Sequence, residues 1–241
     1  AGAGAKVMLA DVDRAAVEKA AGEMDQAGNQ VDYFQLDVTS PDSIVALMNR
    51  ISETYNRIDV LVNSAALDPK FDPDHAAEQT NSFEKYPLEL WRQAIDVNLT
   101  GMFLVTQVVA REMSRVGKGS IINICSTYGL VGPDQRIYER PGEPELYKPV
   151  YYSVTKAGVL GFTRYLATYY QGTEIRVNAL TPGGVFNDHD EQFVEAYSAR
   201  TVLGRMARKD EMNGALLFLA SDASSYMTGA NLVVDGGWTA W

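Results

Sequence analysis

Tyr152 and Lys156 stand four residues apart in the segment Tyr152-Ser153-Val154-Thr155-Lys156, whose pattern predicts a helix. Residues at this spacing lie on the same face of a helix. A cation beside a phenol favours the phenolate, so this pair could transfer protons near neutral pH. For an isolated match the preferred interpretation is a surface lysine beside a half-buried tyrosine, so the surrounding motifs must decide.

The elements that would position this pair are strands and helices in alternation. Strands are expected at Lys6–Ala10, Val31–Leu36, Ile58–Asn63, Ser120–Cys125, Ile175–Leu180 and Leu232–Val234. Helices are expected at Asp13–Ala27, Pro41–Tyr55, Leu88–Val116, Tyr151–Gln171 and Lys209–Ala220. This alternation predicts an α/β fold with a doubly wound, mostly parallel, Rossmann-type sheet and helices on both faces. With no internal repeat and no linker, residues 1–241 are expected to form a single domain.

Several short motifs accompany the pair along the chain. They are Asp37-Val38, Asn63-Ser64-Ala65-Ala66, Asn98-Leu99-Thr100-Gly101, Ser126, Pro182-Gly183 and the closing run 229–237. Together with Tyr152 and Lys156 they resemble the motifs of the short-chain dehydrogenase/reductase family, over essentially all 241 residues. The resemblance implies an oxidoreductase that transfers a hydride between a nicotinamide cofactor and a secondary alcohol or ketone. A small polar substrate is expected, and a sugar-like one is weakly favoured.

The resemblance also implies roles for the catalytic residues. Tyr152 would be the general acid/base, and Ser126 would hold the substrate carbonyl or hydroxyl by a hydrogen bond. Lys156 would lower the pKa of Tyr152 and bind the nicotinamide ribose. Asn98 would support a water that links Lys156 to solvent, and its poor helix propensity in a helical stretch mildly favours a special role. The alternative for Ser126 is a hydroxyl that caps the backbone at a strand end.

A dinucleotide cofactor is the second implication. Asp11 ends the first predicted strand, where an acid hydrogen-bonds the ribose hydroxyls and repels a 2′-phosphate. NAD is therefore expected in preference to NADP, although nearby Arg14 keeps NADP open. The other residues implied in cofactor binding are Asp37, Val38, Asn63, Ala65, Tyr152, Lys156, Pro182, Gly183 and Val185. Ala66 replaces a family glycine and Phe186 stands near the place of a family threonine, so the contacts there stay open.

The family's opening strand and glycine-rich turn have no counterpart in the sequence. Gly2 and Gly4 precede the strand Lys6–Ala10, whereas a phosphate-binding turn follows a strand. In the strand order 3-2-1-4-5-6, the first strand lies between the second and the fourth. We therefore expect a gap one strand wide between Lys6–Ala10 and Ile58–Asn63, and further N-terminal residues that fill it. The alternative is a truncated or catalytically retired scaffold or binding protein that no longer binds the dinucleotide.

Composition narrows the partners. The net charge of −10 disfavours a nucleic acid or an anionic membrane as the main partner. No apolar run reaches the ~20 residues of a membrane span. The single cysteine, Cys125, cannot form an internal disulfide, which favours a reducing compartment and a cytoplasmic location. The acidic run around His189 lacks the spacing of familiar metal sites, and both His189 and His75 are expected at the surface, so no metal is expected.

Two long irregular segments interrupt the alternation of strands and helices. The segments are Asp68–Tyr86 and Val131–Val150, and the second resembles an insertion near the mouth of the active site because Ser126 and Tyr152 lie about twice as far apart as in the family. A solvated or oligomer-contacting loop is the equal alternative.

The resemblance also implies a homo-oligomer, either a dimer or a tetramer, with the tetramer favoured. One interface would use the helices Leu88–Val116 and Tyr151–Gln171, and the other the last helix and strand.

Overall fold

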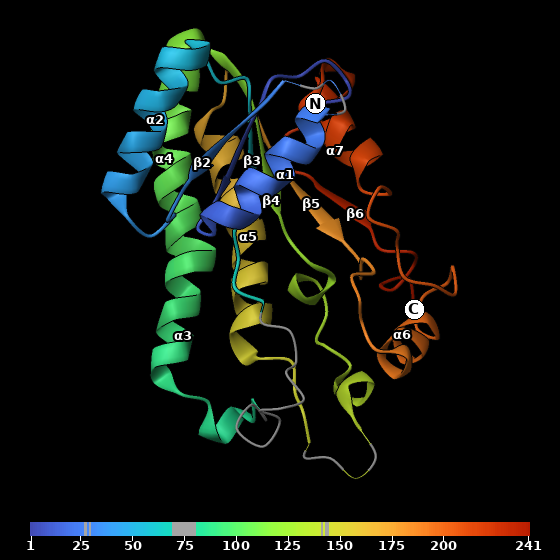
Figure 1. The fold of residues 1–241 in the computed structure, drawn as a ribbon. Helices are drawn as coiled ribbons and strands as arrows, with labels where there is room; N and C mark the ends of the chain where they lie inside the picture. The colour runs from blue at the N-terminus through green and yellow to red at the C-terminus, as the bar shows by residue number, and fades with distance from the viewer. Residues whose placement is uncertain (27, 29, 69–80, 141, 143–144) are drawn as a thin grey trace.

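The computed structural model describes residues 1–26, 28, 30–68, 81–140, 142 and 145–241, and Figure 1 shows strands and helices in alternation. The strands are β1 (Val7–Asp11), β2 (Val31–Gln35), β3 (Val60–Asn63), β4 (Lys118–Ile124), β5 (Glu174–Pro182) and β6 (Asn231–Val234). The helices are α1 (Arg14–Gln26), α2 (Pro41–Tyr55), α3 (Leu88–Ile95), α4 (Met102–Val116), α5 (Val150–Tyr169), α6 (Glu191–Ser198) and α7 (Asn213–Ala220). The predicted α/β fold with parallel sheets and flanking helices is confirmed.

Local sequence accounts for where the first helices begin and end. The Asp13 carboxylate accepts a hydrogen bond from the backbone N–H of Ala16 at 3.0 Å, which caps the start of α1. Ser40 caps α2 in the same way, and Pro41 fills the first turn, where its missing N–H costs nothing. α2 ends at Asn56, which has a positive φ of 62°.

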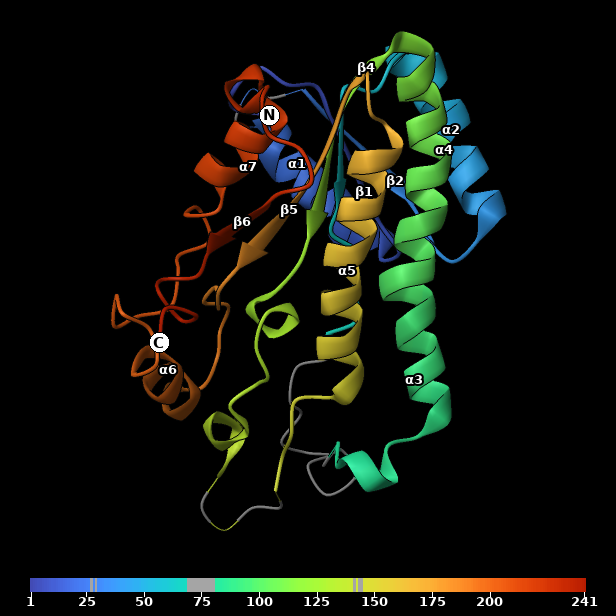
Figure 2. The ribbon, with the colours of Figure 1, turned by 180° about the vertical axis from the view of Figure 1, so that it is seen from behind.

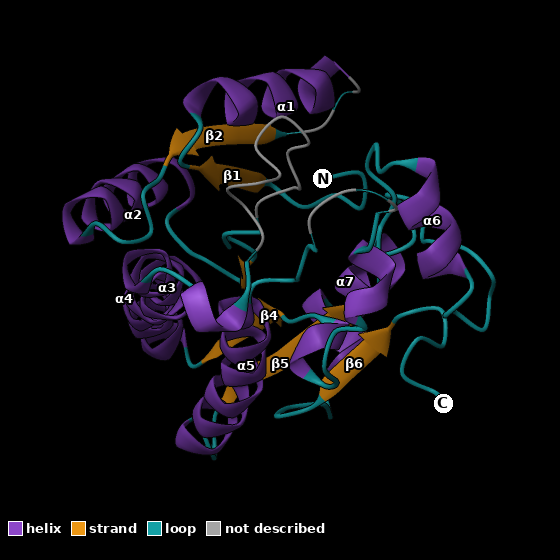
Figure 3. Cartoon of the chain, turned by 90° about the horizontal axis from the view of Figure 1, so that it is seen from below, coloured by secondary structure: helices purple, strands orange, loops and turns teal. Residues whose placement is uncertain are grey.

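The strands form two parallel sheets. One sheet has the order β1-β2 and the other the order β3-β4-β5-β6. Figure 3 shows β1 and β2, together with α1, on one side of the molecule and β4, β5 and β6 on the other. Within the described residues β1 and β3 are not hydrogen-bonded to each other, so the expectation that these two strands are unpaired is confirmed.

Helices cover both faces of the larger sheet. α4 and α5 pack on one face, where Val109, Met113, Ile121 and Val177 form a buried cluster. α7 packs on the other face, with Leu219 against the inner strands. Figure 2 shows these helices on opposite sides of β4 and β5, whose residues are therefore buried in nearly continuous runs.

Two predicted helices need correction, and the structure has a helix that was not predicted. The expected helix Leu88–Val116 is interrupted by a π-helical turn at Asp96–Gly101, which separates α3 from α4. The expected helix Lys209–Ala220 begins only at Asn213, because Glu211 instead pairs with Arg205 and accepts a hydrogen bond from a backbone N–H. α6 was not expected, and it begins at Asp190, whose carboxylate accepts a hydrogen bond from the third residue on, Phe193, at 2.9 Å.

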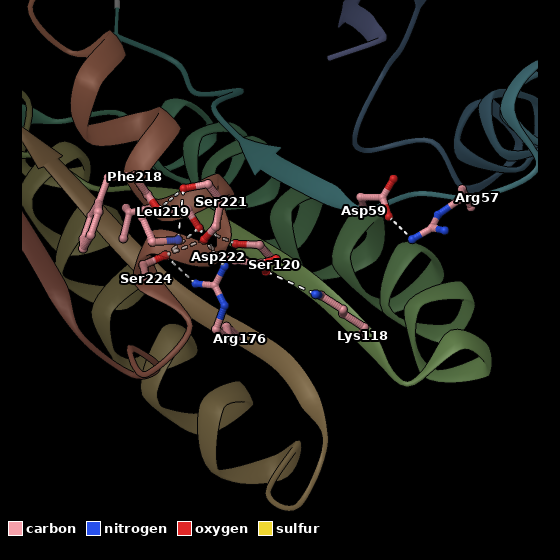
Figure 4. Close-up of polar contacts among 11 residues, drawn as sticks. Arg57, Asp59, Lys118, Ser120, Arg176, Phe218, Leu219, Ser221, Asp222 and Ser224 are labelled. Atoms are coloured by element: carbon pink, nitrogen blue, oxygen red, sulfur yellow. Dashed lines mark hydrogen bonds and ion pairs between the residues drawn. The ribbon is translucent and has the colours of Figure 1, made fainter. Parts of the chain in front are cut away.

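The amino-terminal ends of the strands are held by a polar cluster around Arg176 of β5, shown in Figure 4. Its guanidinium donates to the carbonyls of Leu219 and Ser221, both at 3.1 Å, and to the hydroxyl of Ser224 at 2.8 Å. Ser120 of β4 donates to the same Leu219 carbonyl at 2.8 Å. These bonds satisfy carbonyls that the end of α7 leaves without helical partners, so the cluster locks α7 onto the sheet.

Candidate active site

Two neighbouring cavities lie at the carboxyl ends of β3, β4 and β5. The smaller, of about 230 Å³, is lined by Ser126, Tyr152, Gly183 and Val185, among others. The larger, of about 860 Å³, opens beside it and is lined by both irregular segments. The residues that line both cavities are Asp68, Tyr138, Lys148, His189 and Phe193. Because open α/β sheets bind ligands at this edge, the cavities mark the candidate active site.

The Tyr152–Lys156 pair sits in the first half of α5, as its spacing predicts. Lys156 is buried, with 5% of its surface exposed, and its Nζ donates to the carbonyl of Ile124 at 3.0 Å. The Nζ atom lies 5.7 Å from the centre of the Tyr152 ring. Burial lowers the pKa of Lys156. The interpretation as a surface lysine is therefore wrong, because the ammonium is held inside the protein beside the phenol.

The phenol of Tyr152 lies in a largely buried, aromatic environment. Its ring packs edge-on against Tyr128, with the ring centres 6.4 Å apart. Burial raises the pKa of Tyr152 and the charge of Asp68 raises it further, whereas a hydrogen bond with Ser126 lowers it. The net direction is upward, which is opposite to the effect that the sequence led us to expect from Lys156.

Ser126 follows β4 directly and combines two roles that the sequence left as alternatives. Its Oγ accepts a hydrogen bond from the backbone N–H of Tyr128 at 3.2 Å, so it caps the short helical turn Thr127–Gly129. The same hydroxyl contacts the phenol of Tyr152 and lines the smaller cavity. The cap fixes the position of the hydroxyl, which can still hydrogen-bond a ligand.

Asn98 lies in the π-helical turn and is 2% exposed. Its Oδ1 accepts a hydrogen bond from the N–H of Leu67 at 2.7 Å, and its Nδ2 donates to the hydroxyl of Thr155 at 3.2 Å. Asn98 therefore ties the segment after β3 to α5, one residue away from Lys156. π-helical turns are frequently found at functional sites, which agrees with a special role for this residue.

The residues predicted to bind a dinucleotide stand at the carboxyl ends of several strands. Asp11 ends β1, Asp37 and Val38 follow β2, and Ala65 follows β3. Pro182 ends β5 and is followed by Gly183 and Val185. Among the described residues, Gly183 and Val185 line the smaller cavity, whereas Asp11, Asp37, Val38 and Ala65 line neither cavity.

Three of these positions have specific packing or hydrogen bonds. The Asp11 carboxylate accepts from the backbone N–H of Asp13 at 2.9 Å. The Asp37 carboxylate accepts from the N–H and hydroxyl of Thr39, which lowers the pKa of Asp37. Val38 packs against the π-helical turn, where a Cβ on Gly101 would lie 2.5 Å from it.

The side chain of Asn63 is used inside the core. Its Nδ2 donates to Asn123 Oδ1 and to Thr106 Oγ1, both at 2.8 Å, and Asn123 in turn donates to Thr163 at 2.9 Å. This buried network connects β3 and β4 with α4 and α5. The Nδ2 group of Asn63 is therefore committed to the core.

Asp68 and Lys148 are two site residues that the sequence reasoning missed. They form an ion pair between the segment after β3 and the insertion before α5, and the Lys148 ammonium lies 4.2 Å from the centre of the Tyr152 ring. One signal could have identified Lys148: it precedes Tyr152 by four residues, the spacing at which Lys156 follows it. Asp68, 80 residues away along the chain, gives no comparable signal.

The insertion Val131–Val150 borders the larger cavity, as expected for a segment at the mouth of the site. Its residues Tyr138, Arg140, Tyr147 and Lys148 line the cavity, while its Ile137 is buried in the core. Residues 141 and 143–144 of the insertion, and 69–80 of the other irregular segment, lie outside the described residues.

Histidine and acidic residues do not gather into a metal site in the described part of the chain, where no group of three or more His, Cys, Asp or Glu side chains could hold an ion. His189 is half-buried, lines both cavities and stacks on Phe193 with ring centres 5.0 Å apart. His75 lies outside the described residues. Over the same described residues, none of the helices has the length and apolarity to cross a bilayer.

Comparison with known proteins identifies relatives of the whole chain. A family model described as "Enoyl-(Acyl carrier protein) reductase" matches residues 1–239. The chain is 36% identical over 245 residues to a cis-4-hydroxycyclohexanecarboxylate dehydrogenase from Sinomonas cyclohexanicum, covering 98% of this chain and 88% of the relative. It is 34% identical over 238 residues to a 3-oxoacyl-(acyl-carrier-protein) reductase from Thermotoga maritima, covering 97% and 87%.

A solved structure agrees with the curated relatives. The crystal structure of a gluconate 5-dehydrogenase from Burkholderia cenocepacia, in complex with NADP and tartrate, matches with a TM-score of 0.83 and 29% identity. The match covers 100% of this chain and 88% of that one. The likeness therefore extends across the whole fold.

Proposed function

Because the chain belongs to the short-chain dehydrogenase/reductase family, we propose that it is an NAD-dependent oxidoreductase that interconverts a secondary alcohol and a ketone on a small, hydroxylated, sugar-like substrate. One observation carries this proposal. Lys156, a buried cation, lies 5.7 Å from the ring of Tyr152, and Tyr152 and Ser126 both line the cavity at the carboxyl end of β4. A buried cation beside a phenol in a cavity is the arrangement that proton transfer requires.

Ser126, Tyr152 and Lys156 would each have a separate role in the reaction. Ser126 would hold the substrate oxygen by a hydrogen bond, in a position fixed by its backbone cap. Tyr152 would take the proton of the alcohol during oxidation and return it to the ketone oxygen during reduction. Lys156 would stabilise the phenolate electrostatically against the effect of burial. Asn98 would position Leu67 and Thr155 rather than touch the substrate.

The chain fits a nicotinamide dinucleotide along the carboxyl ends of its strands. Gly183 has no room for a side chain, because a Cβ there would lie 2.8 Å from the Cα of Asp235, so the turn after β5 offers bare backbone groups to a ligand. We propose that Asp37, Val38, Asn63, Ala65, Pro182, Gly183 and Val185 contact the cofactor, together with Tyr152 and Lys156. A bound nicotinamide would accept or supply the hydride.

Asp11 supports NAD rather than NADP. It ends β1 with an exposed carboxylate, the place where an acid bonds ribose hydroxyls and repels a 2′-phosphate. Its carboxylate already accepts a hydrogen bond from the N–H of Asp13, which holds it at the strand end.

The walls of the larger cavity favour a hydroxylated ring as substrate. Tyr86, Tyr147, Tyr151 and Phe193 supply aromatic surface, and Asp68 joins Lys148 as a polar pair. Flat aromatic faces can pack on the C–H surface of a ring while polar groups bond its hydroxyls.

We further propose a cytoplasmic homo-oligomer, a dimer or a tetramer. Exposed apolar side chains on α4 and α5 support one interface, with Phe103 46% and Tyr165 63% exposed. Leu217 of α7 and Val233 of β6 are also exposed and support a second. The location rests on Cys125, the one cysteine in the sequence, which is buried as a free thiol.

The proposed activity is tested by mixing the purified protein with NAD or NADP and a panel of cyclic and open-chain secondary alcohols. Formation of the reduced cofactor should depend on the alcohol and should be faster with NAD. Quenching or a shift of NADH fluorescence, measured separately, reports binding without turnover. If the protein neither binds NADH nor oxidises any alcohol of the panel, the enzyme interpretation is wrong and the scaffold interpretation replaces it.

A further inference from the structure

The ion pair of Asp68 and Lys148 lies where the two cavities meet, and no other part of the proposed mechanism uses it. The Lys148 side chain is 14% exposed, and its ammonium lies 4.2 Å from the centre of the Tyr152 ring. Lys148 is therefore a cation within reach of any substrate whose oxygen bonds Tyr152. Such a cation would ordinarily attract an anionic substrate group.

Asp68 counteracts this attraction. Its carboxylate is paired with the Lys148 ammonium, and its negative charge raises the pKa of the Tyr152 phenol. Asn98 holds the preceding residue, Leu67, by hydrogen bonds to both its N–H and its carbonyl. The carboxylate is thus anchored next to the lysine by the same asparagine that braces α5 through Thr155.

The other cation of the larger cavity is neutralised in the same way. Arg140, whose side chain is 13% exposed, donates from one nitrogen to both carboxylate oxygens of Asp190, at 3.0 and 2.9 Å. Asp188 adds a further acid to the wall. Each of the two cations among the described lining residues therefore has its own carboxylate, and these lining residues carry more acidic than basic side chains.

From this charge balance we propose that the Asp68–Lys148 pair is a specificity determinant, which admits uncharged, hydroxyl-bearing substrates to Tyr152 and disfavours carboxylates. A hydroxyl can donate to Asp68 and accept from Lys148 at once, so it fits the pair without breaking it. A carboxylate would have to displace Asp68 or face it as a like charge. The inference deepens the proposed function and rests on it for the identity of the site.

A matched pair of ligands separates the two cases. cis-4-Hydroxycyclohexanecarboxylate and cis-4-(hydroxymethyl)cyclohexanol share a ring and a secondary alcohol and differ in the charge of one substituent. Binding of each to the protein is measured by ligand-observed NMR with NADH present, because NADH cannot accept a hydride from the alcohol, and kcat/KM with NAD is measured separately. Because binding is read without turnover, absence of activity would contradict the proposed function while the inference is still decided by the binding data.

The wild type is expected to bind the uncharged ligand more tightly. Asp68→Asn leaves the lysine unpaired and should shift the preference toward the carboxylate by about tenfold, the effect of one close charge pair. In the double variant Asp68→Asn, Lys148→Met the shift should disappear, because the cation that attracts the carboxylate is gone. Glu211→Gln breaks the Arg205–Glu211 pair, which contacts neither cavity, and serves as the control with no shift.

Two results would overturn the inference. One is a wild type that binds the carboxylate more tightly, which would make Lys148 an anion-binding residue. The other is an unchanged preference in Asp68→Asn, provided that the variant unfolds at the same temperature as the wild type. If Asp68→Asn does not fold, two other variants test the inference. Asp68→Glu keeps the negative charge and should keep the wild-type preference. Lys148→Met removes the cation and should not increase binding of the carboxylate.

Discussion

The two ends of β4 and β5 each hold a buried or partly buried cation, and the two cations differ in how fully they are hydrogen-bonded. At the amino-terminal end, Arg176 donates to two carbonyls and one hydroxyl. At the carboxyl end, the described residues give the Lys156 ammonium one acceptor, the carbonyl of Ile124. An ammonium has three donors, so Lys156 keeps donors for a ligand whereas Arg176 is committed to the fold.

Burial lowers the pKa of both Arg176 and Lys156, so the shift alone does not distinguish the two ends. The neighbours do. Arg176 is surrounded by the last carbonyls of α7, which need donors. Lys156 lies beside the phenol of Tyr152, and Tyr152 and Ser126 line a cavity. The difference suggests that a buried cation indicates function when its partners can themselves change protonation state or bind a ligand.

The largest effect is expected at the carboxyl end, from Tyr152→Phe. Removing the phenol removes the general acid/base, and kcat should fall by about 10²–10⁴. The folded state should keep its stability, because the ring still packs on Tyr128. Steady-state oxidation and a thermal melt measure the two quantities, and turnover close to that of the wild type would refute the assignment of Tyr152.

Lys156→Met should change the pH dependence more than the fold. The cation lies 5.7 Å from the ring. Its loss removes an attraction for the phenolate, so the pKa of Tyr152 should rise further. The pH–rate profile for oxidation should therefore move to higher pH, and NAD should bind more weakly. A profile that stays in place would show that Lys156 does not act on Tyr152.

The same variant makes a prediction about stability. Because burial lowers the pKa of Lys156 in the folded state, the unfolded chain binds the proton more tightly. The charged ammonium thus lowers the free energy of unfolding by its full amount at every pH below the folded-state pKa of Lys156. This destabilisation decreases as the pH rises from the folded-state pKa to the higher unfolded-state pKa. Lys156→Met should unfold at neutral pH no more easily than the wild type, as urea titration would measure.

Arg176→Met should give the reverse pattern. The variant leaves the carbonyls of Leu219 and Ser221 without their donor, which should lower the free energy of unfolding by about 2 kcal/mol. The activity of the folded fraction should be unchanged. Arg115→Met, which removes an exposed ion pair with Glu112 on α4, is the matched control and should cost less than about 1 kcal/mol. Equal losses in both variants would remove the contrast between the two ends.

The smallest expected effect is at Asp11, the acid that ends β1. Asp11→Ser removes the group that would repel a 2′-phosphate, and the ratio of kcat/KM for NADP to that for NAD should rise by about tenfold. Asp25→Asn, on exposed α1, is the control. An unchanged ratio would mean that the choice of cofactor is made elsewhere in the site.

The sequence predicted most of the fold and the placement of Ser126, Tyr152 and Lys156, because periodicity and strand ends are local properties. It did not predict the π-helical turn at Asp96–Gly101, since the apolar pattern continues through it. Nor did it predict α6, whose start depends on an aspartate cap inside the acidic run around His189.

Contacts between residues far apart along the chain could not be predicted from the sequence either. Asp68 and Lys148 meet only because two irregular segments converge over Tyr152, and neither segment has a period that could be read. The pKa of Tyr152 was misjudged for the same reason, since burial by distant residues such as Tyr128 outweighs the lysine one helical turn away.

The central claim is that Tyr152 and Lys156 serve hydride transfer between an alcohol and a nicotinamide cofactor. The most direct measurement incubates the protein with NAD and a secondary alcohol deuterated at its carbinol carbon, and follows deuterium in the reduced cofactor by mass spectrometry. We predict that deuterium is transferred by the wild type and that Tyr152→Phe transfers it at least about 10² times more slowly. A protein that binds NADH but transfers no deuterium from any alcohol in the panel would contradict the account.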